Sequence, residues 1–226
     1  MRRNLFFIVI GVGGAAVLLW LGFWQTQRLD WKLSEIRKID AGIAADPVEL
    51  PASPDPESDS YLPVEVSGQL GSEYLRVLVS QKEIGAGYRI ISVLDMGGRR
   101  VLLDRGFTPV AQQNIPTHEG TVTVQGNLQW PQETDGFTPA PDTAKNIWFA
   151  RDVAVMAETL KTEPILIVAK KTSFNDAPVS ALPVDTAAIP NDHLSYAITW
   201  FSLAAIWMAM TVAFLLRARR APQPKS

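Results

Sequence analysis

The chain has 226 residues, of which 47% are hydrophobic, 21 are Lys or Arg and 23 are Asp or Glu. Such a length suits one sizeable domain with membrane anchors. The absence of cysteine excludes disulfides and thiolate sites for zinc, copper or iron–sulfur clusters. All acidic residues lie between Asp30 and Asp192 with no basic stripe among them, so we expect no nucleic-acid partner.

Two uncharged apolar runs are the most prominent feature. Leu5–Trp24 spans 20 residues and Tyr196–Leu216 spans 21, and about 20 apolar residues cross the hydrocarbon core as a helix. We therefore predict transmembrane helices over residues 1–25 and 194–217. The first run is open to a second interpretation, a secretory signal. We favour an uncleaved anchor, because the run exceeds the roughly 7–15 residues of a signal core and lacks a small-residue cleavage site.

The distribution of charge predicts the orientation. Six basic residues lie at the chain ends, whereas the segment between the apolar runs carries 15 basic and 23 acidic residues. Positive charge marks the cytoplasmic side, so we expect both termini, including a basic tail over residues 218–226, to be cytoplasmic. No Ser-rich, Arg-rich transit peptide is seen. We therefore expect a protein of the bacterial inner membrane, surrounded by membrane lipid, with a periplasmic domain.

The first helix is expected to continue beyond the membrane. Trp20, Trp24, Arg28 and Trp31 follow at spacings of 4, 4 and 3, which places them on one helix face. An interfacial belt of aromatic and basic residues explains Trp24 and Arg28. It accounts less well for the continuation of this face to Trp31.

From residue 61 the hydrophobic period changes to two, which is typical of strands. The expected strands are 64–70, 74–79, 87–94, 99–104, 121–128 and 165–169. Residues 152–160 have helical periodicity instead. We therefore predict an α+β extracytoplasmic domain over residues 61–175, an antiparallel, barrel-like sheet with one or two short helices, flanked by the two transmembrane helices. Before it, residues 26–60 combine the helix extension with a Pro-rich acidic linker, and residues 176–193 form a second linker.

This domain shows no catalytic motif. The sequence has no nucleophile elbow, phosphate loop, zinc motif or dinucleotide fingerprint. Asp104 and Arg105 are adjacent in a strand and so point to opposite faces, and we expect structural ion pairs with other partners. His118 precedes a glycine turn and is expected in a surface loop. An enzyme is therefore the least favoured class of protein.

His193 is the strongest candidate for a functional residue. It lies at the start of the second apolar run, after Pro190, where Asn191 or Asp192 can cap the helix. A neutral imidazole is a good ligand for haem iron. From residue chemistry alone, however, an interfacial histidine without a cofactor is the favoured interpretation.

A haem also requires apolar surroundings and donors for its propionates. If the two helices pack side by side, the rings of Trp24, Tyr196, Trp200 and Phe201 can supply the first. The side chains of Gln25, Arg28 and Lys32 can supply the second. The composition permits such a site without requiring it.

Four stretches follow one another along the chain: Leu-Gly-Phe-Trp-Gln at 21–25, Val-Leu-Leu-Asp-Arg-Gly-Phe-Thr-Pro at 101–109, Asn-Ile-Trp-Phe-Ala-Arg-Asp at 146–152 and Asn-Asp-His-Leu-Ser-Tyr-Ala at 191–197. Together they resemble the Surfeit locus protein one family of cytochrome c oxidase assembly factors. Phe107 and Asp192 depart from the family pattern, in which Trp and Asn are common. The His, the Trp motifs and Arg28 are intact.

The resemblance implies a non-enzymatic haem a chaperone. It implies His193 as the haem-iron ligand, at a site with Tyr196, Trp200, Trp24, Gln25 and Arg28. The implied partners are subunit I of a haem–copper oxidase, into which haem a is inserted, and a haem a synthase. The alternative is a membrane-anchored assembly scaffold for the oxidase that binds no cofactor, in which His193 only caps or anchors the helix.

Overall fold

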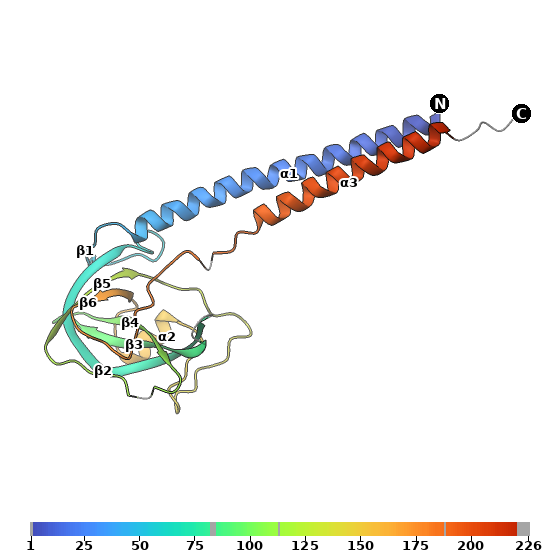
Figure 1. Cartoon of the computed structure of the whole chain (residues 1–226). Helices are drawn as coiled ribbons and strands as arrows, with labels where there is room; N and C mark the ends of the chain where they lie inside the picture. The colour runs from blue at the N-terminus through green and yellow to red at the C-terminus, as the bar shows by residue number, and fades with distance from the viewer. Residues whose placement is uncertain (1, 82–84, 113, 188, 221–226) are drawn as a thin grey trace, which may run out of the picture. The chain divides into compact units, whose positions relative to one another are not determined.

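The computed structural model describes residues 2–81, 85–112, 114–187 and 189–220 (Figure 1). The chain divides into two compact units. One contains the residues up to Lys38 together with those from Ala187 onward, and the other is Ile39–Thr186. The two units correspond to a pair of long helices and a sheet domain, and each is described by itself.

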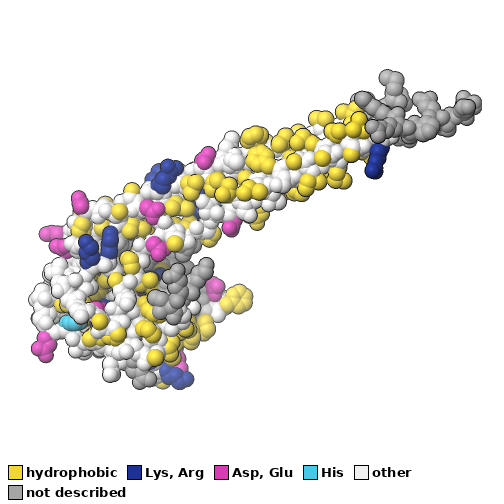
Figure 2. Space-filling view, viewed as in Figure 1, with side chains coloured by type: hydrophobic (Ala, Val, Ile, Leu, Met, Phe, Trp, Pro, Cys, Tyr) yellow, Lys and Arg dark blue, Asp and Glu magenta, His cyan; other side chains and the backbone are white. Residues whose placement is uncertain are grey.

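The helical unit is built from α1 (Arg2–Ile43) and α3 (His193–Arg220), which run antiparallel and side by side (Figure 1). Both are long and apolar enough to cross a membrane. At about 1.5 Å per residue, α1 is roughly 60 Å long, twice the thickness of the hydrocarbon core. Hydrophobic side chains predominate along most of the pair, and charged ones lie toward its ends (Figure 2).

The sheet domain contains six strands and one short helix among the described residues. The strands are β1 (Val48–Glu49), β2 (Pro63–Gln81), β3 (Gly85–Asp95), β4 (Arg100–Pro109), β5 (Thr121–Leu128) and β6 (Leu166–Thr172). Their order is β1-β2-β3-β4-β6-β5, and β2 also pairs with β5, so the ladder returns to β2. The helix α2 (Val153–Leu160) begins after Asp152, whose carboxylate caps it by accepting the Val155 amide.

The sheet is mixed, which corrects the expectation of an antiparallel one. Strand β6 pairs parallel with β4, and β1 pairs parallel with β2, whereas the other pairings are antiparallel. The segment that contains α2 separates β5 from β6 in the sequence, and it lets the chain return with β6 between β4 and β5. Alternation along a strand does not reveal such a choice of neighbours.

Strand β2 is one long strand where two were expected. Its first half pairs with β5 and its second half with β3, and the register shifts between Leu70 and Tyr74. Gly71 lies in this shift, and a Cβ atom added there would lie 3.2 Å from Val93 of β3. The long strand therefore connects β5 with β3, because its first half pairs with β5 and its second half with β3.

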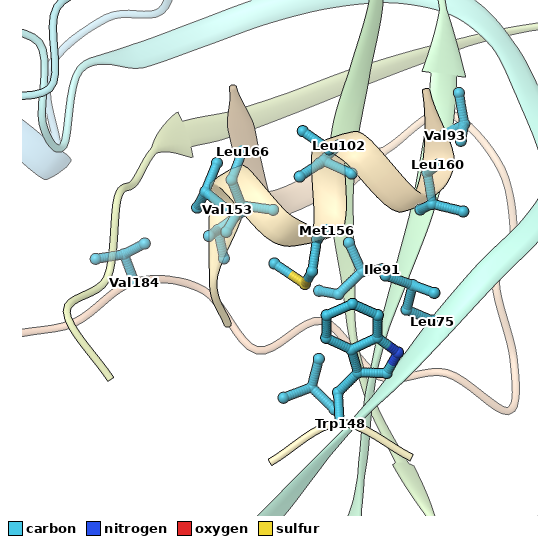
Figure 3. Packing of buried hydrophobic residues seen from close by; sticks show 13 residues of the cluster. Leu75, Ile91, Val93, Leu102, Trp148, Val153, Met156, Leu160, Leu166 and Val184 are labelled. Carbon is cyan, nitrogen blue, oxygen red and sulfur yellow. The ribbon is translucent and has the colours of Figure 1, made fainter. Parts of the chain in front are cut away.

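Hydrophobic residues fill both faces of the sheet. On one face α2 presents Val153, Met156 and Leu160 to Trp148 and to side chains of β2, β3, β4 and β6 (Figure 3). On the other face the strands contribute a second cluster, which includes Val64 and Leu103. The apolar run of β4 is buried on both sides for this reason.

Both expected linkers pack partly against the domain. Within residues 26–60, α1 continues to Ile43, β1 joins the sheet, and the Pro51 carbonyl accepts a hydrogen bond from Arg99. Within residues 176–193, Ser180 exchanges two backbone hydrogen bonds of 2.8 Å with Phe107. The compact unit Ile39–Thr186 is accordingly longer than the domain expected over residues 61–175.

Candidate functional site

Small residues allow α1 and α3 to pack closely. Gly11, Ala15 and Gly22 of α1 and Ala197 and Ala204 of α3 are buried, at spacings of 4 and 7 residues on α1 and 7 residues on α3, which suit a heptad pattern. A Cβ atom at Gly22 would lie 2.7 Å from the Phe201 ring. Small residues at helix interfaces in membranes permit such an approach and the van der Waals contact it brings.

The contact between the helices includes polar groups at two depths. Trp207 Nε1 donates a hydrogen bond of 2.9 Å to the carbonyl of Gly11. At the other end of the pair, His193 Nδ1 lies 2.8 Å from Oε1 of Gln25. The Gln25 side chain is buried, with the residue only 8% exposed, so the two helices are joined at the level of His193 by a side-chain hydrogen bond.

This hydrogen bond selects the tautomer of His193. An amide oxygen can only accept, so in a neutral imidazole that keeps this bond Nδ1 carries the proton and Nε2 keeps its lone pair. His193 is half-exposed, and no hydrogen bond to Nε2 is found from the described residues. A second group that binds Nδ1 and orients the ring is the arrangement typical of a metal-ligating histidine. The pair can therefore present a neutral imidazole nitrogen to an iron atom.

Aromatic and cationic side chains lie on one flank of the helix pair near His193. Trp24 is 47% exposed and Tyr196 is 54% exposed. Helical spacing places Trp24 and Arg28, four residues apart, on the same flank of α1. The Arg28 guanidinium carbon lies 3.9 Å above the centre of the Trp31 ring, within the range of a cation–π contact. This flank offers ring faces and a fixed positive charge.

The residues predicted for a haem site are not all placed alike. Gln25, predicted as a propionate donor, instead orients His193. Phe201 contacts the ring of Phe23, with 5.4 Å between centroids, and it lies away from the flank of Trp24 and Tyr196. Trp200 is half-buried in α3 on the same side as Tyr196.

The donor set fits a single-ligand haem site better than a metal-ion site. In the described part of the chain, no group of three or more His, Cys, Asp or Glu is positioned to hold a metal ion. The Oδ1 atom of Asn191 is buried and has no hydrogen-bond partner there. One imidazole nitrogen, exposed rings and an exposed arginine match the needs of a porphyrin, which brings four iron ligands of its own.

The sequence left two features of this site unassigned. The hydrogen bond between His193 and Gln25 joins residues 168 positions apart, and nothing local in the chain indicates it. The stacking of Arg28 on Trp31 has a sequence signal, because the two residues are three apart on one helix.

The charged residues of the sheet domain form structural ion pairs, as expected for Asp104 and Arg105. Arg89 Nη1 donates to Asp104 at 2.6 Å, and Arg151 Nη1 approaches the same oxygen at 3.4 Å. Asp104 is fully buried. Arg151 also donates from Nε to Glu133 at 3.0 Å. Each buried charge is therefore compensated.

Arg105 points to the other face and binds Asp176 with two guanidinium nitrogens, Nε at 2.9 Å and Nη2. His118 lies 3.6 Å from the same carboxylate, and its ring packs against Phe174 with 4.0 Å between centroids. His118 lies in the loop before Gly120, as expected, but its side chain is half-buried in this cluster. Asp176 belongs to the segment predicted as a linker. It is 71 residues from Arg105 in the sequence, so nothing local in the chain indicates their ion pair.

Comparisons with known proteins place these features in a family context. A model described as the SURF1 family matches residues 12–205 of the chain. Surfeit locus protein 1 of Homo sapiens is 31% identical over 210 residues, which cover 82% of this chain and 69% of the human protein. The SURF1-like protein of Monosiga brevicollis is 30% identical over 236 residues, which cover 91% and 88% of the two chains.

Proposed function

Because this chain belongs to the SURF1 family, which is generally linked to cytochrome c oxidase assembly, we propose that it carries haem a for the oxidase. Members of this family are assembly factors rather than known enzymes. In this proposal the protein binds haem a at the outer boundary of the membrane and aids its insertion into subunit I. The hydrogen bond from His193 to Gln25 is the observation that carries the proposal, because it leaves Nε2 available as an iron ligand.

The proposed roles of the surrounding residues follow from their chemistry. Trp24, Tyr196 and Trp200 provide ring faces for the porphyrin, and Arg28 provides charge for a propionate. His193 would be the one protein ligand that holds the haem iron. A single coordinate bond from the protein would suit a carrier, because such a protein must also release its cargo.

The proposed membrane arrangement rests on charge. Basic residues beside both apolar helices favour the cytoplasm for the two chain ends, and the sheet domain between the helices is then outside a bacterial inner membrane. His193 then lies at the outer boundary, where the apolar part of α3 begins. Subunit I of the oxidase and a haem a synthase are the proposed partners, as recipient and donor of the haem.

The test is a visible spectrum of the protein purified from the membranes of cells that make haem a. We expect a haem spectrum for the parent chain and its loss in His193→Ala. His118→Ala, which replaces the chain's other histidine, is the control and should retain the spectrum if the domain remains folded by circular dichroism. A parent chain without haem would refute the carrier and favour the cofactor-free scaffold. A spectrum that survives His193→Ala would refute the ligand assignment.

A further inference from the structure

A long apolar groove runs along one flank of the helix pair within the predicted membrane core. Its wider part has a volume of about 490 Å³ and is lined by Gly13, Val17, Leu18, Leu203, Ile206 and Met210. A narrower part of about 210 Å³ continues past Trp207 to Phe7 and Phe214. The larger volume alone is in the range of small-molecule sites.

The groove exists because α1 has glycine at this depth. A Cβ atom added at Gly13 would meet no atom within 4 Å, so the space beside it is empty. At Gly14 an added Cβ would lie 2.6 Å from Trp207, so the two helices are in contact at the base of the groove. On the other flank, nearer to His193 than the groove, the rings of Phe23 and Phe201 contact each other.

The groove lies on the same flank as the residues around His193. On α1, Gly14, Val17, Leu21, Trp24 and Arg28 follow at spacings of 3, 4, 3 and 4, which keep to one side of a pair of packed helices. On α3 the equivalent series is Tyr196, Trp200, Leu203, Trp207 and Met210.

The distance between the groove and His193 is short. Leu18 is seven residues from Gln25 along α1, which corresponds to about 10 Å of helix. The groove thus begins about one porphyrin width below the imidazole.

We propose that this groove holds the farnesyl-derived tail of haem a while His193 holds the iron. The proposal rests on the proposed function, and it adds the determinant that distinguishes haem a from haem b, which lacks the tail. The lining is apolar, the groove starts below the iron ligand and descends into the membrane, and its elongated shape suits a flexible isoprenoid chain. A tail packed in the groove gains van der Waals contacts with protein side chains that a tail surrounded only by lipid lacks.

Titration of the full-length protein in phospholipid nanodiscs with three haems tests the proposal. Haem a and haem o both carry the tail, whereas haem b does not. We expect the parent chain to bind haem a and haem o about tenfold more tightly than haem b. Gly13 lines the groove, and a Cβ atom added there meets no atom within 4 Å. Gly13→Leu is therefore expected to occupy part of the groove, and it should abolish this preference while leaving the affinity for haem b unchanged. Ala16→Leu places the same side chain on an exposed position of α1 outside the groove and should bind like the parent.

Each other outcome overturns the proposal in a distinguishable way. Equal affinity of the parent chain for the three haems, or an unchanged preference in Gly13→Leu, would refute the tail site and leave the carrier function standing. The groove would then belong to a lipid chain or to a helix of a partner. If the parent chain binds none of the three haems, the carrier function itself fails. Loss of all haem binding in Gly13→Leu together with altered helix content would be followed by Gly13→Ala, which should weaken the preference only partly.

Discussion

Gln25, in the middle of one helix, orients His193, the first residue of another, through a hydrogen bond of 2.8 Å. The two residues are 168 positions apart in the chain. The bond sets which imidazole nitrogen is available, and it does so at the end of the helix pair where the polar and apolar parts of α1 meet.

Replacing Gln25 should impair the His193 site without unfolding the helices. Gln25→Leu keeps a similar volume but removes the acceptor, so the imidazole loses its orienting partner. We expect haem affinity to fall about 10- to 100-fold, the range for loss of a residue that orients a metal ligand. The measurement is a haem titration followed by absorbance. Gln27→Leu, two residues along and exposed, is the matched control, and equal losses in both variants would contradict the role of Gln25.

Removing Asp104 should destabilise the sheet domain strongly. Asp104→Ala leaves Arg89 and Arg151 as buried cations without their shared carboxylate, which typically costs about 3–5 kcal/mol. The loss of stability is measured by urea unfolding of the full chain in detergent, with hydrogen exchange of the β4 amides as the signal. Asp46→Ala alters an exposed residue and should change the free energy of unfolding by less than about 0.5 kcal/mol. A stability close to the parent in Asp104→Ala would show that the two arginines find other partners.

Gly106 should tolerate no side chain. Its φ is +119°, and a Cβ atom would collide with the Ser180 carbonyl, whose segment crosses β4 at this point. We expect Gly106→Ala to lower the free energy of unfolding by about 3 kcal/mol or more and to expose residues 176–184 to protease. Gly97 also has a positive φ, of +78°, but has open space around it, so Gly97→Ala should cost only about 1–2 kcal/mol. Similar losses at both glycines would mean that backbone strain, not the contact with Ser180, is decisive.

The ion pair between Glu133 and Arg151 should make the domain sensitive to acid. Burial acts to raise the pKa of Glu133, but hydrogen bonds and charge attraction from Arg151 outweigh it, and the pKa lies below its ordinary value of 4.5. The unfolded chain therefore binds this proton more readily than the folded one, so the stabilisation is present above pH 4.5 and is lost as the pH falls through the folded pKa. Urea unfolding at a series of pH values from 7 to 3 should show a shallower acid decline in Glu133→Gln than in the parent. Parallel declines would contradict this assignment.

The charge distribution predicts that both ends of the chain are cytoplasmic. A reporter protein that is active only in the cytoplasm should be active when it is fused after Ser226. The same reporter inserted in the exposed acidic turn at residues 55–58 should be silent in bacterial cells. The opposite pattern would reverse the orientation and place His193 at the inner boundary of the membrane.

Much of the architecture followed from the sequence because its causes are local. Two uncharged runs of helical length indicate the spans, since a helix satisfies its own backbone hydrogen bonds within hydrocarbon. The helical periodicity of residues 152–160 likewise indicates α2, because the apolar residues that share one face of this helix are close together in the chain. His193 was singled out because an ionisable residue at the edge of such a run requires an explanation.

Tertiary structure alone decided which distant groups meet. The parallel pairing of β6 with β4, the docking of Asp176 on Arg105 and the bond between Gln25 and His193 all join segments far apart in the chain. No periodicity encodes these choices, because they depend on which surfaces pack together once the elements have formed. The open flank beside Gly13 is of the same kind. A glycine in a helix is ambiguous in sequence, and only the position of the second helix shows that this one borders empty space.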